Sequence, residues 1–339
     1  MNDNLSLREY RSIRRLKDKW NDIYVKGSYT PFSTYEYNRI CRIAFFLRKK
    51  HWKFRCRFIC FEEDGKCGIW ALLIDDTLKT IYNISHDSPM DYYEVMSNTD
   101  DVVFAKKCFE RLKEKYQGYD LCLENIKENS TIKSILPANI DAEPCVHIDL
   151  NNYNNWYNNL SKHQRQNIRT AYNRIRKDEI ELRLEHYSAE KGNPSVVDWF
   201  KCMLMYENRS IDKLYKNGGS VSRLGRLNRY KNMLFAASNN SLMKLPSRLV
   251  FVLYVRKEPV AYLGGFYDEK KSVFYVGRLC CSNKWLKYDM GIVLLDKVIK
   301  ELTREEKDCC LDLTRGDEPY KYAMGGVTHY NYCYKVSCN

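Results

Sequence analysis

The densest group of reactive side chains in this 339-residue chain lies between Asp312 and Tyr322, directly after an apolar stretch. Seven of these eleven residues carry a charge or a phenol. Open α/β sheets place ligands at the carboxyl ends of their strands. A turn alone does not require such a mixture of acid, base and phenol. The segment therefore predicts a functional site.

Carboxylates in this segment are candidates for proton transfer. Asp317 and Glu318 are the general-base candidates, and the neighbouring cations Arg315 and Lys321 would keep them ionised by lowering their pKa values. The alternative is an internal salt-bridge knot that fixes a strand-to-helix turn, with Pro319 in the first helical turn. Both interpretations stay open on the sequence alone.

The size and hydropathy of the chain limit its class. A length of 339 residues suits two domains, and a hydrophobic fraction of 44% can fill two cores. Residues 1–19 are polar and basic, without the apolar core of a signal peptide. The longest apolar run, residues 69–74, is too short to span a bilayer. We therefore expect a soluble, cytoplasmic protein without a membrane span, of undetermined oligomeric state.

Charge and cysteine content add two expectations. The formal net charge of +13 favours an anionic partner such as nucleic acid, membrane phosphate or a phosphorylated cofactor, although a solvated basic surface explains most such cases. The 14 cysteines form no CxxC pair and the 6 histidines are scattered. We expect the cysteines to act as small buried hydrophobes, and we expect no metal site.

The two halves of the sequence show the same order of expected elements. Each has strands that lead into a helix, a strand, a short helix and a final strand, and Asp64-Gly65 predicts a tight hairpin. The first half has expected helices at 5–24, 34–50, 102–116 and 128–136 and strands at 57–62, 67–74, 79–84, 119–124 and 145–149. The second half has expected helices at 161–177, 195–210, 222–237, 290–304 and 319–324 and strands at 180–187, 248–256, 260–267, 273–281, 309–313 and 328–336. We predict two similar α/β (α+β) domains, at 1–150 and 151–339, with mixed, mostly antiparallel sheets.

Three segments of the second half resemble one known family. They are the basic stretch Leu160–Arg174, the segment Tyr288–Leu295 and the closing Arg315-Gly-Asp-Glu-Pro-Tyr-Lys321. In this order they are similar to motifs of the BioF2-like, or CelD-type, acetyltransferase domain. That domain has the acyl-CoA N-acyltransferase (GNAT) fold and is related to the FemAB-type enzymes that build peptidoglycan bridges. The likeness covers about residues 160–334 and, more weakly, the first half.

The resemblance implies two tandem GNAT-like domains, the first degenerate and the second catalytic. It implies transfer of an acetyl or other acyl group from acyl-CoA to an amine or hydroxyl of a small molecule, a sugar or a cell-envelope precursor. Asp317 and Glu318 would then serve as base, and Tyr320 would protonate the leaving thiolate. The residues implied to bind the cofactor are Leu279, Cys280, Cys281, Met290, Gly291 and Ile292, and those implied to bind the substrate are Arg165, Arg169, Asp312, Arg315 and Lys321.

The start of the helix expected at 290 is a candidate phosphate site. A helix N-terminus offers unpaired N–H groups and a positive dipole end, and Gly291 permits close backbone approach. The family's longer glycine loop is reduced here to this one residue. Asp289 would repel phosphate unless Lys284 and Lys287 offset its charge; alternatively, Asp289 only caps the helix.

Two other functions fit the same sequence. The basic charge and the reduced glycine loop suit a FemAB-like transferase that uses aminoacyl-tRNA, with tRNA as partner. Such relatives often carry a helical coiled-coil arm, and no long heptad run is present here. The third interpretation is a non-catalytic GNAT-fold binding protein.

Overall fold

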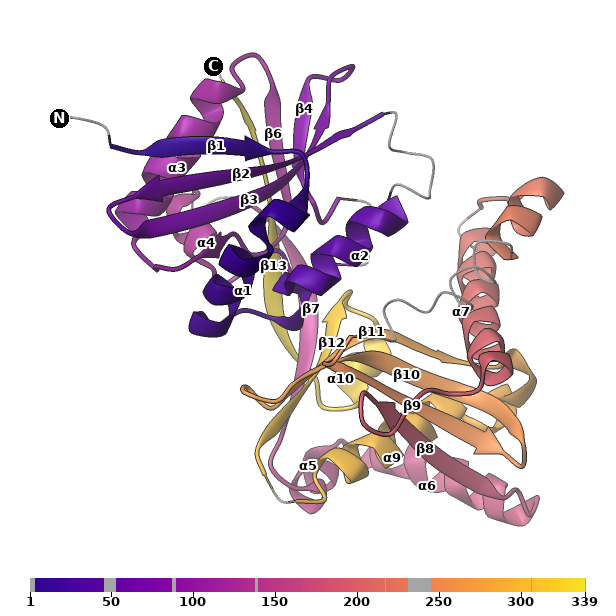
Figure 1. Ribbon diagram of the computed structural model, residues 1–339. Coiled ribbons are helices and arrows are strands. Elements are labelled where there is room, and N and C mark those ends of the chain that lie inside the picture. The colour runs from indigo at the N-terminus through magenta and orange to yellow at the C-terminus, as the bar shows by residue number, and fades with distance from the viewer. Residues whose placement is uncertain are drawn as a thin grey trace. The chain divides into compact units, whose positions relative to one another are not determined.

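A computed structural model describes residues 4–45, 53–86, 90–137, 140–216, 218–230, 245–305 and 307–338 (Figure 1). Contacts between Cα atoms divide the chain into two units. The first comprises Met1–Cys145 together with Thr328–Asn339, and the second comprises Val146–Val327. Within the described residues, no helix is both long and apolar enough to cross a membrane.

The first unit is built on a mixed sheet with the strand order β1-β2-β3-β4-β6-β13. Its neighbours are antiparallel except β4 and β6, which are parallel. The short strand β5 pairs with β3. The strands are β1 (Ser6–Tyr10), β2 (Arg55–Glu63), β3 (Lys66–Asp75), β4 (Thr80–Asn83), β5 (Met96–Ser97), β6 (Asp120–Lys127) and β13 (Val327–Ser337).

Helices pack on this sheet through apolar faces. Helix α3 begins after Asp101, whose side chain accepts hydrogen bonds from the first N–H groups of the helix, and its Phe104 and Leu112 join the main core of the unit. Trp20 of α1 packs edge-on against Phe58 of β2. The helices of this unit are α1 (Lys17–Lys26), α2 (Tyr35–Phe45), α3 (Val102–Lys115) and α4 (Thr131–Ile135).

The second unit repeats this plan with the strand order β7-β12-β11-β10-β9-β8. The strands β8 to β11 form an antiparallel ladder, and β11 is parallel to β12. The strands are β7 (Asp141–Leu150), β8 (Leu182–Ser188), β9 (Arg248–Val255), β10 (Glu258–Asp268), β11 (Val273–Cys281) and β12 (Cys309–Arg315). The helices are α5 (Tyr153–Asn159), α6 (Lys162–Lys177), α7 (Val196–Lys216), α9 (Met290–Leu302) and α10 (Pro319–Ala323), and residues 223–230 are also helical.

The second sheet has a separate hydrophobic core on each of its two faces. Helices α6 and α9 bury Ile168 and Val293 in the larger core, together with Leu253 of β9. Helix α7 supplies Trp199 to the smaller core, where it packs against Tyr262 of β10. Because successive side chains of a strand point to opposite faces, these strands are apolar on both sides.

A buried carboxylate joins three helices of this unit. Asp296 of α9 accepts hydrogen bonds from the phenols of Tyr153 in α5 and Tyr172 in α6, at 2.7 Å and 2.6 Å. The bonds hold the basic helix α6 against α9. Tyr172 therefore points inward, away from the outer face of α6.

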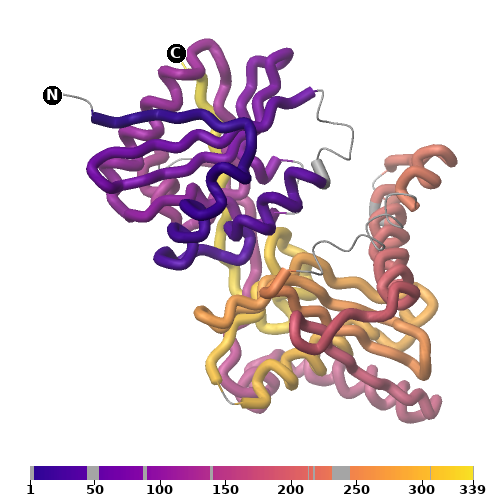
Figure 2. The backbone as a smooth tube through the Cα atoms, viewed as in Figure 1, coloured from indigo at the N-terminus to yellow at the C-terminus, as the bar shows by residue number. Residues whose placement is uncertain are grey.

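The predicted repeat of element order is confirmed. In both units four antiparallel strands lead into a helix, a parallel strand and a short helix. The last strand of each repeat then joins the sheet of the other repeat. Strand β7 of the first repeat lies next to β12, and strand β13 of the second repeat pairs with β6. Figure 2 shows the yellow C-terminal stretch running among the strands of the first unit, where both chain ends lie.

The structure contains β5 and α5, which were not expected, and it differs from the sequence-based expectations in two further places. Residues expected to begin a helix at 5–24 instead form β1, which is held by pairing with β2, and only 17–26 are α-helical. The C-terminal residues 328–338, assigned by sequence to the second domain, lie in the first unit. Both differences arise from strand pairing between residues far apart in the chain, which local patterns do not reveal.

Candidate active site

The strands β11 and β12 stay paired over only a short distance. Their parallel ladder runs from Val273 to Tyr275 on β11, and the Thr314 hydroxyl then donates a hydrogen bond to the carbonyl oxygen of Val276, at 3.0 Å. Beyond that point β11 is bulged opposite Gly264 and Gly265. A Cβ on Gly265 would lie 1.8 Å from the carbonyl oxygen of Tyr275, so this approach requires glycine. Residues 277–281 of β11 therefore continue past the end of the β12 ladder.

Lys321 holds the turn that follows β12. Its side chain is 3% exposed, and its ammonium donates hydrogen bonds to the carbonyl oxygens of Thr314, Arg315 and Gly316 at 3.2, 2.7 and 2.9 Å. It also pairs with Glu318 at 3.2 Å. This is the internal knot considered from the sequence, and it uses Lys321, which was expected to bind substrate, as a structural clamp.

The remaining reactive groups of this segment lie at its surface. Asp317 is exposed, and Tyr320 is half-buried on α10. Burial, together with the nearby Glu318 carboxylate, raises the pKa of Tyr320 to about 12, and the Arg209 charge opposes this rise. Tyr320 therefore holds its proton more tightly than an ordinary phenol, and it is protonated near neutral pH.

Arg209 of α7 contacts the end of β11, and its charge acts on Tyr320. Its guanidinium donates a hydrogen bond to the carbonyl oxygen of Leu279, at 2.8 Å. Its charge also opposes the rise in the pKa of the Cys281 thiol that burial causes, as it does for Tyr320. A cation thus contacts the backbone of β11 beyond the point where β11 and β12 separate, and its charge also acts on the protonated phenol of Tyr320.

The N-terminus of α9 adjoins the same strand end. The Gly291 N–H donates a hydrogen bond to the thiol of Cys281, and a Cβ on Gly291 would lie 3.8 Å from that sulfur. Asp289 precedes the helix with a left-handed backbone, φ +50°, and its side chain makes no capping hydrogen bond. Its carboxylate instead accepts a hydrogen bond from Arg174 of α6, at 3.0 Å.

The charge of Asp289 is therefore offset by Arg174 rather than by the expected lysines. Lys284 pairs with Glu258, and Lys287 pairs with Asp178. Local sequence patterns do not indicate this role of Arg174, because its contact with Asp289 depends on how α6 packs beside α9. Neutralisation by this arginine removes much of the repulsion that the acid would exert on a phosphate.

The six predicted cofactor residues fall in two adjoining places. Three lie on the last part of β11 and three in the first turn of α9, and the contact between Cys281 and Gly291 joins the two. Cys280 and Met290 are buried and point into the cores, so only their backbone groups are available to a ligand. The residues are Leu279, Cys280, Cys281, Met290, Gly291 and Ile292.

The predicted substrate residues have diverse surroundings. Arg165 donates hydrogen bonds to the carbonyl oxygens of Asn158 and Leu160 at the end of α5, and Arg169 donates one to the phenol of Tyr157. Asp312 is buried and accepts the Thr314 N–H at 2.8 Å, which stabilises the left-handed Thr314 backbone.

Arg315 is exposed beside Asp317, and it has interactions of its own. Within the described part of the chain, no hydrogen bond or ion pair connects Arg165 or Arg169 with the turn that bears Asp317 and Tyr320. Arg209 is the residue that sequence reasoning missed, since nothing in its local sequence distinguishes it from the other polar residues of α7.

Comparison with known families identifies the second unit. Residues 162–322 match the family described as acetyltransferase (GNAT) domain. This part of the chain is a GNAT acetyltransferase domain. The resemblance drawn from the basic helix, the Tyr288–Leu295 segment and the closing motif is thereby confirmed. No curated protein matches the chain.

Solved structures show that the GNAT-like fold extends over the whole chain. The C-terminal domain of a putative lysylphosphatidylglycerol synthetase from Agrobacterium fabrum is 11% identical with a TM-score of 0.55, covering 95% of this chain and 91% of that chain. FemX is 10% identical with a TM-score of 0.55, covering 96% and 97%. A conserved protein of unknown function from Bacteroides thetaiotaomicron is 12% identical with a TM-score of 0.53, covering 97% and 99%. These similarities support the tandem arrangement of two GNAT-like domains.

The GNAT family implies acyl-CoA as co-substrate, and the second unit has groups that suit it. The backbone of β11 beyond Val276 can bond an extended amide-bearing chain, and the first turn of α9 can receive phosphate. Arg209 supplies positive charge at the end of β11, and Arg174 balances the Asp289 carboxylate at the start of α9.

Proposed function

We propose that the protein transfers an acyl group from acyl-CoA to an amine or hydroxyl, and that the second unit carries the reaction. The contact of Arg209 with the end of β11, together with its electrostatic effect on Tyr320, carries this proposal. In it, the backbone of residues 279–281 lines the pantetheine arm, and the first turn of α9 faces the pyrophosphate. The acyl group can be acetyl, because the family is described as an acetyltransferase domain.

Tyr320 supplies the proton that the departing thiolate needs. The phenol carries its proton at neutral pH and lies half-buried on α10, so it can donate that proton to a leaving group bound beside it. Arg209 is exposed but is held at the end of β11 by its hydrogen bond to Leu279 O, so its positive charge offsets negative charge that develops beside that backbone. These two groups form the electrophilic side of the site.

Asp317 accepts the proton of the attacking amine or hydroxyl. It is exposed, so an acceptor can reach it from solvent, and among the described residues it has no ion-pair partner. Glu318 forms an ion pair with Lys321, and its charge helps to raise the pKa of Tyr320. We therefore give Glu318 a positioning role. The resemblance to BioF2-like enzymes makes a saccharide or a cell-envelope precursor the acceptor class to test first.

A thermal-shift titration tests this function. Acetyl-CoA should raise the melting temperature of the full chain saturably, because a ligand that binds only the folded state stabilises it. Desulfo-CoA should act similarly if the nucleotide part dominates binding. Arg209→Gln should weaken the shift, whereas Arg304→Gln, at an exposed position on the same unit, should leave it unchanged. A flat response to both CoA compounds, with no acyl transfer to any amine or sugar offered, would contradict the proposal.

One observation favours a second function, transfer from aminoacyl-tRNA. Helix α7 and the helical residues 223–230 form a paired arm (Figure 1), in which Arg229 binds Glu207 at 2.7 Å and Arg226 donates a hydrogen bond to the phenol of Tyr215 at 2.7 Å. The sequence showed no heptad run, yet such an arm is what the FemAB resemblance implies. Helix α6 also presents exposed Lys162, Arg169, Arg176 and Lys177.

Total tRNA included in the same titration separates the two functions. Stabilisation by tRNA that falls steeply with salt, without any response to acetyl-CoA, would favour the aminoacyl-tRNA reaction. Stabilisation by acetyl-CoA alone would favour the first function. If Asp317→Asn and Tyr320→Phe left the biological activity intact, a non-catalytic binding role would be the better explanation.

A further inference from the structure

Two thiols and a carboxylate meet on the first sheet, on the face that α1 covers. Cys60 and Glu62 lie two residues apart on β2 and therefore point to the same face. Cys67 of β3 lies directly opposite Glu62 in the register. One ligand atom from each of the three residues lies within 4.8 Å of the others. We propose that Cys60, Glu62 and Cys67 form a binding site for a thiophilic divalent cation such as Zn²⁺.

The spacing of the two sulfur atoms suits one shared ion. The Sγ atoms of Cys60 and Cys67 are 3.7 Å apart. Two thiolate sulfurs bound at about 2.3 Å to a tetrahedral zinc ion lie roughly 3.8 Å from each other. The Glu62 carboxylate supplies a third, oxygen ligand, so the set has the mixed sulfur and oxygen character that zinc accepts.

The backbone of Cys67 is fixed before any ion arrives. Its N–H donates a hydrogen bond to the Asn98 side-chain oxygen at 2.7 Å, and the Asn98 N–H donates to the Cys67 carbonyl at 3.1 Å. The Asn98 amide also donates to Gly65 O at 2.9 Å, inside the tight β2–β3 turn where Asp64 and Gly65 have positive φ. Outer contacts of this kind orient metal ligands and strengthen metal binding.

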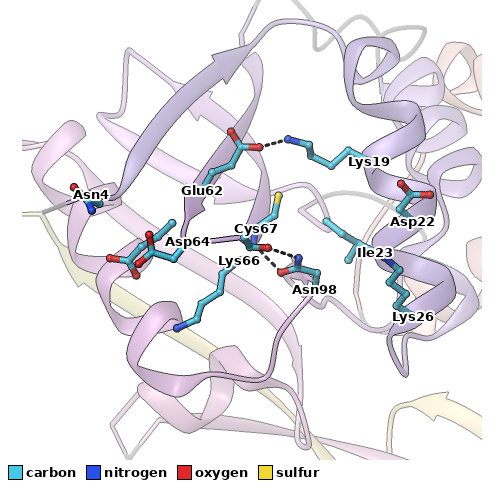
Figure 3. Close-up of a pocket in the computed structure, with 12 residues that line it drawn as sticks. Asn4, Lys19, Asp22, Ile23, Lys26, Glu62, Asp64, Lys66, Cys67 and Asn98 are labelled. Carbon is cyan, nitrogen blue, oxygen red and sulfur yellow. Dashed lines mark hydrogen bonds and ion pairs between the residues drawn. The ribbon is translucent and has the colours of Figure 1, made fainter.

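A pocket gives the site access to solvent. It has a volume of about 430 Å³ and is lined by Glu62 and Cys67 together with residues of α1, as Figure 3 shows. Cys60 is buried beneath it, whereas about a third of the Glu62 side chain is exposed. Three protein ligands beside an open pocket leave the fourth position of a tetrahedral ion to water or to a ligand.

Lys19 of α1 shares this pocket and pairs with the Glu62 carboxylate (Figure 3). Its ammonium is paired with the carboxylate that a metal ion would need as a ligand, and the positive charge of the ammonium repels an incoming cation. Metal binding must therefore displace Lys19 from Glu62. This competition gives the site a signature that an ordinary buried thiol pair lacks: removal of the Lys19 charge should tighten metal binding.

Cobalt titration of the full chain tests the site. Reduced, chelator-treated protein should bind one equivalent of Co²⁺ with the thiolate-to-cobalt charge-transfer absorption and the intense visible bands of a tetrahedral ion, and Zn²⁺ should abolish them. Cys60→Ser and Cys67→Ser should each weaken binding by about tenfold or more, and Glu62→Gln should weaken it while preserving both sulfurs. Lys19→Met should tighten it severalfold.

Cys56→Ser is the matched control. Cys56 lies on the same strand and face as Cys60, roughly 13 Å away along β2, so its loss should leave the cobalt spectrum unchanged. Circular dichroism of every variant separates a lost ligand from a lost fold. The proposal is overturned if the native chain and the Cys60→Ser/Cys67→Ser double variant give the same cobalt spectrum. It is also overturned if the two thiols form a disulfide on mild oxidation but never bind cobalt.

Discussion

At the scale of single residues, Tyr320 and Lys321 are neighbours in the chain with different roles. The Lys321 ammonium is surrounded by three backbone carbonyls and Glu318. The Tyr320 phenol lies half-buried near the Arg209 charge. One residue therefore fixes the turn after β12, and the other is the proton donor that we propose.

Replacing Tyr320 with Phe should reduce kcat by about a hundredfold or more, since general acid catalysis contributes about 10²–10⁴-fold. The phenyl ring keeps the packing, so the Kd of acetyl-CoA should change little. Steady-state kinetics combined with the thermal-shift titration measure the two effects separately. An unchanged kcat would exclude Tyr320 as the proton donor.

Replacing Lys321 with Met should destabilise the protein by about 2–4 kcal/mol, because the change leaves buried carbonyls and Glu318 without their cation. Urea denaturation measures this loss. Lys284→Met is the control: Lys284 pairs with Glu258 at the surface, and such pairs contribute about 1 kcal/mol or less. Equal losses in the two variants would contradict the clamp.

The site proposed here includes the closing segment that the sequence singled out, together with a residue that the sequence did not indicate. The closing segment with Asp317 and Tyr320 was recognisable because reactive side chains and a family motif coincide there. Arg209 was not, because its position depends on how α7 packs on the sheet. Lys321 was assigned to substrate since nothing in a sequence shows that a lysine is buried.

At the scale of elements, the N-terminus of α9 depends on α6. Asp289 stands at the start of the helix, where a negative charge opposes phosphate binding, and Arg174 of α6 pairs with it. The two side chains are partly exposed, so solvent and salt weaken their interaction. Even a weak interaction between these two side chains should change ligand affinity, because the pair lies at the helix N-terminus where a phosphate would bind.

Arg174→Ala should raise the Kd of acetyl-CoA about three- to tenfold, because the Asp289 charge is then uncompensated. The double variant Arg174→Ala/Asp289→Asn should recover most of this loss. Isothermal titration calorimetry at low and high salt measures both, and high salt should shrink the effect. If the double variant binds no better than the single one, repulsion by Asp289 is not the cause.

The elements themselves were predictable where local patterns decide them. Helices α3 and α9 and the Asp64-Gly65 turn occur where expected, since apolar periodicity and turn residues specify them. Strand β1 was mistaken for helix because its short, charged sequence shows little alternation, and pairing with β2 determines its conformation. The Cys60–Cys67 contact is likewise a product of register, not of sequence spacing.

At the scale of the whole molecule, buried thiols and phenols set the response to alkaline pH. None of the 14 cysteines forms a disulfide, and each is buried or half-buried. Burial raises the pKa of groups in both units, among them Tyr93, Tyr116, Cys202 and Tyr254. The folded state therefore retains these protons at pH values where the unfolded chain has lost them.

The free energy of unfolding should be nearly constant between about pH 7 and 8 with respect to these groups. It should fall above about pH 8.5, as unfolded thiols and then phenols ionise. Each buried group adds up to about 1.4 kcal/mol of loss per pH unit. Urea denaturation from pH 7 to 11 measures the slope. Tyr93→Phe should reduce the slope and Tyr330→Phe, at an exposed position, should not; stability that rises over this range would contradict the argument.

The exchange of β7 and β13 between the repeats has a consequence for synthesis on the ribosome. Domains generally fold in order as they emerge, at about 5–20 residues per second. Here the sheet of the first unit lacks its neighbour for β6 until residues 328–338 exist, and the whole of Val146–Val327 is translated before them. For roughly ten to forty seconds the nascent first unit must present an open β6 edge, which is a template for wrong pairing. The sheet of the first unit is therefore completed only after the C-terminal strand has been synthesised. Until then, the β6 edge is the part of the nascent chain that a chaperone would need to protect.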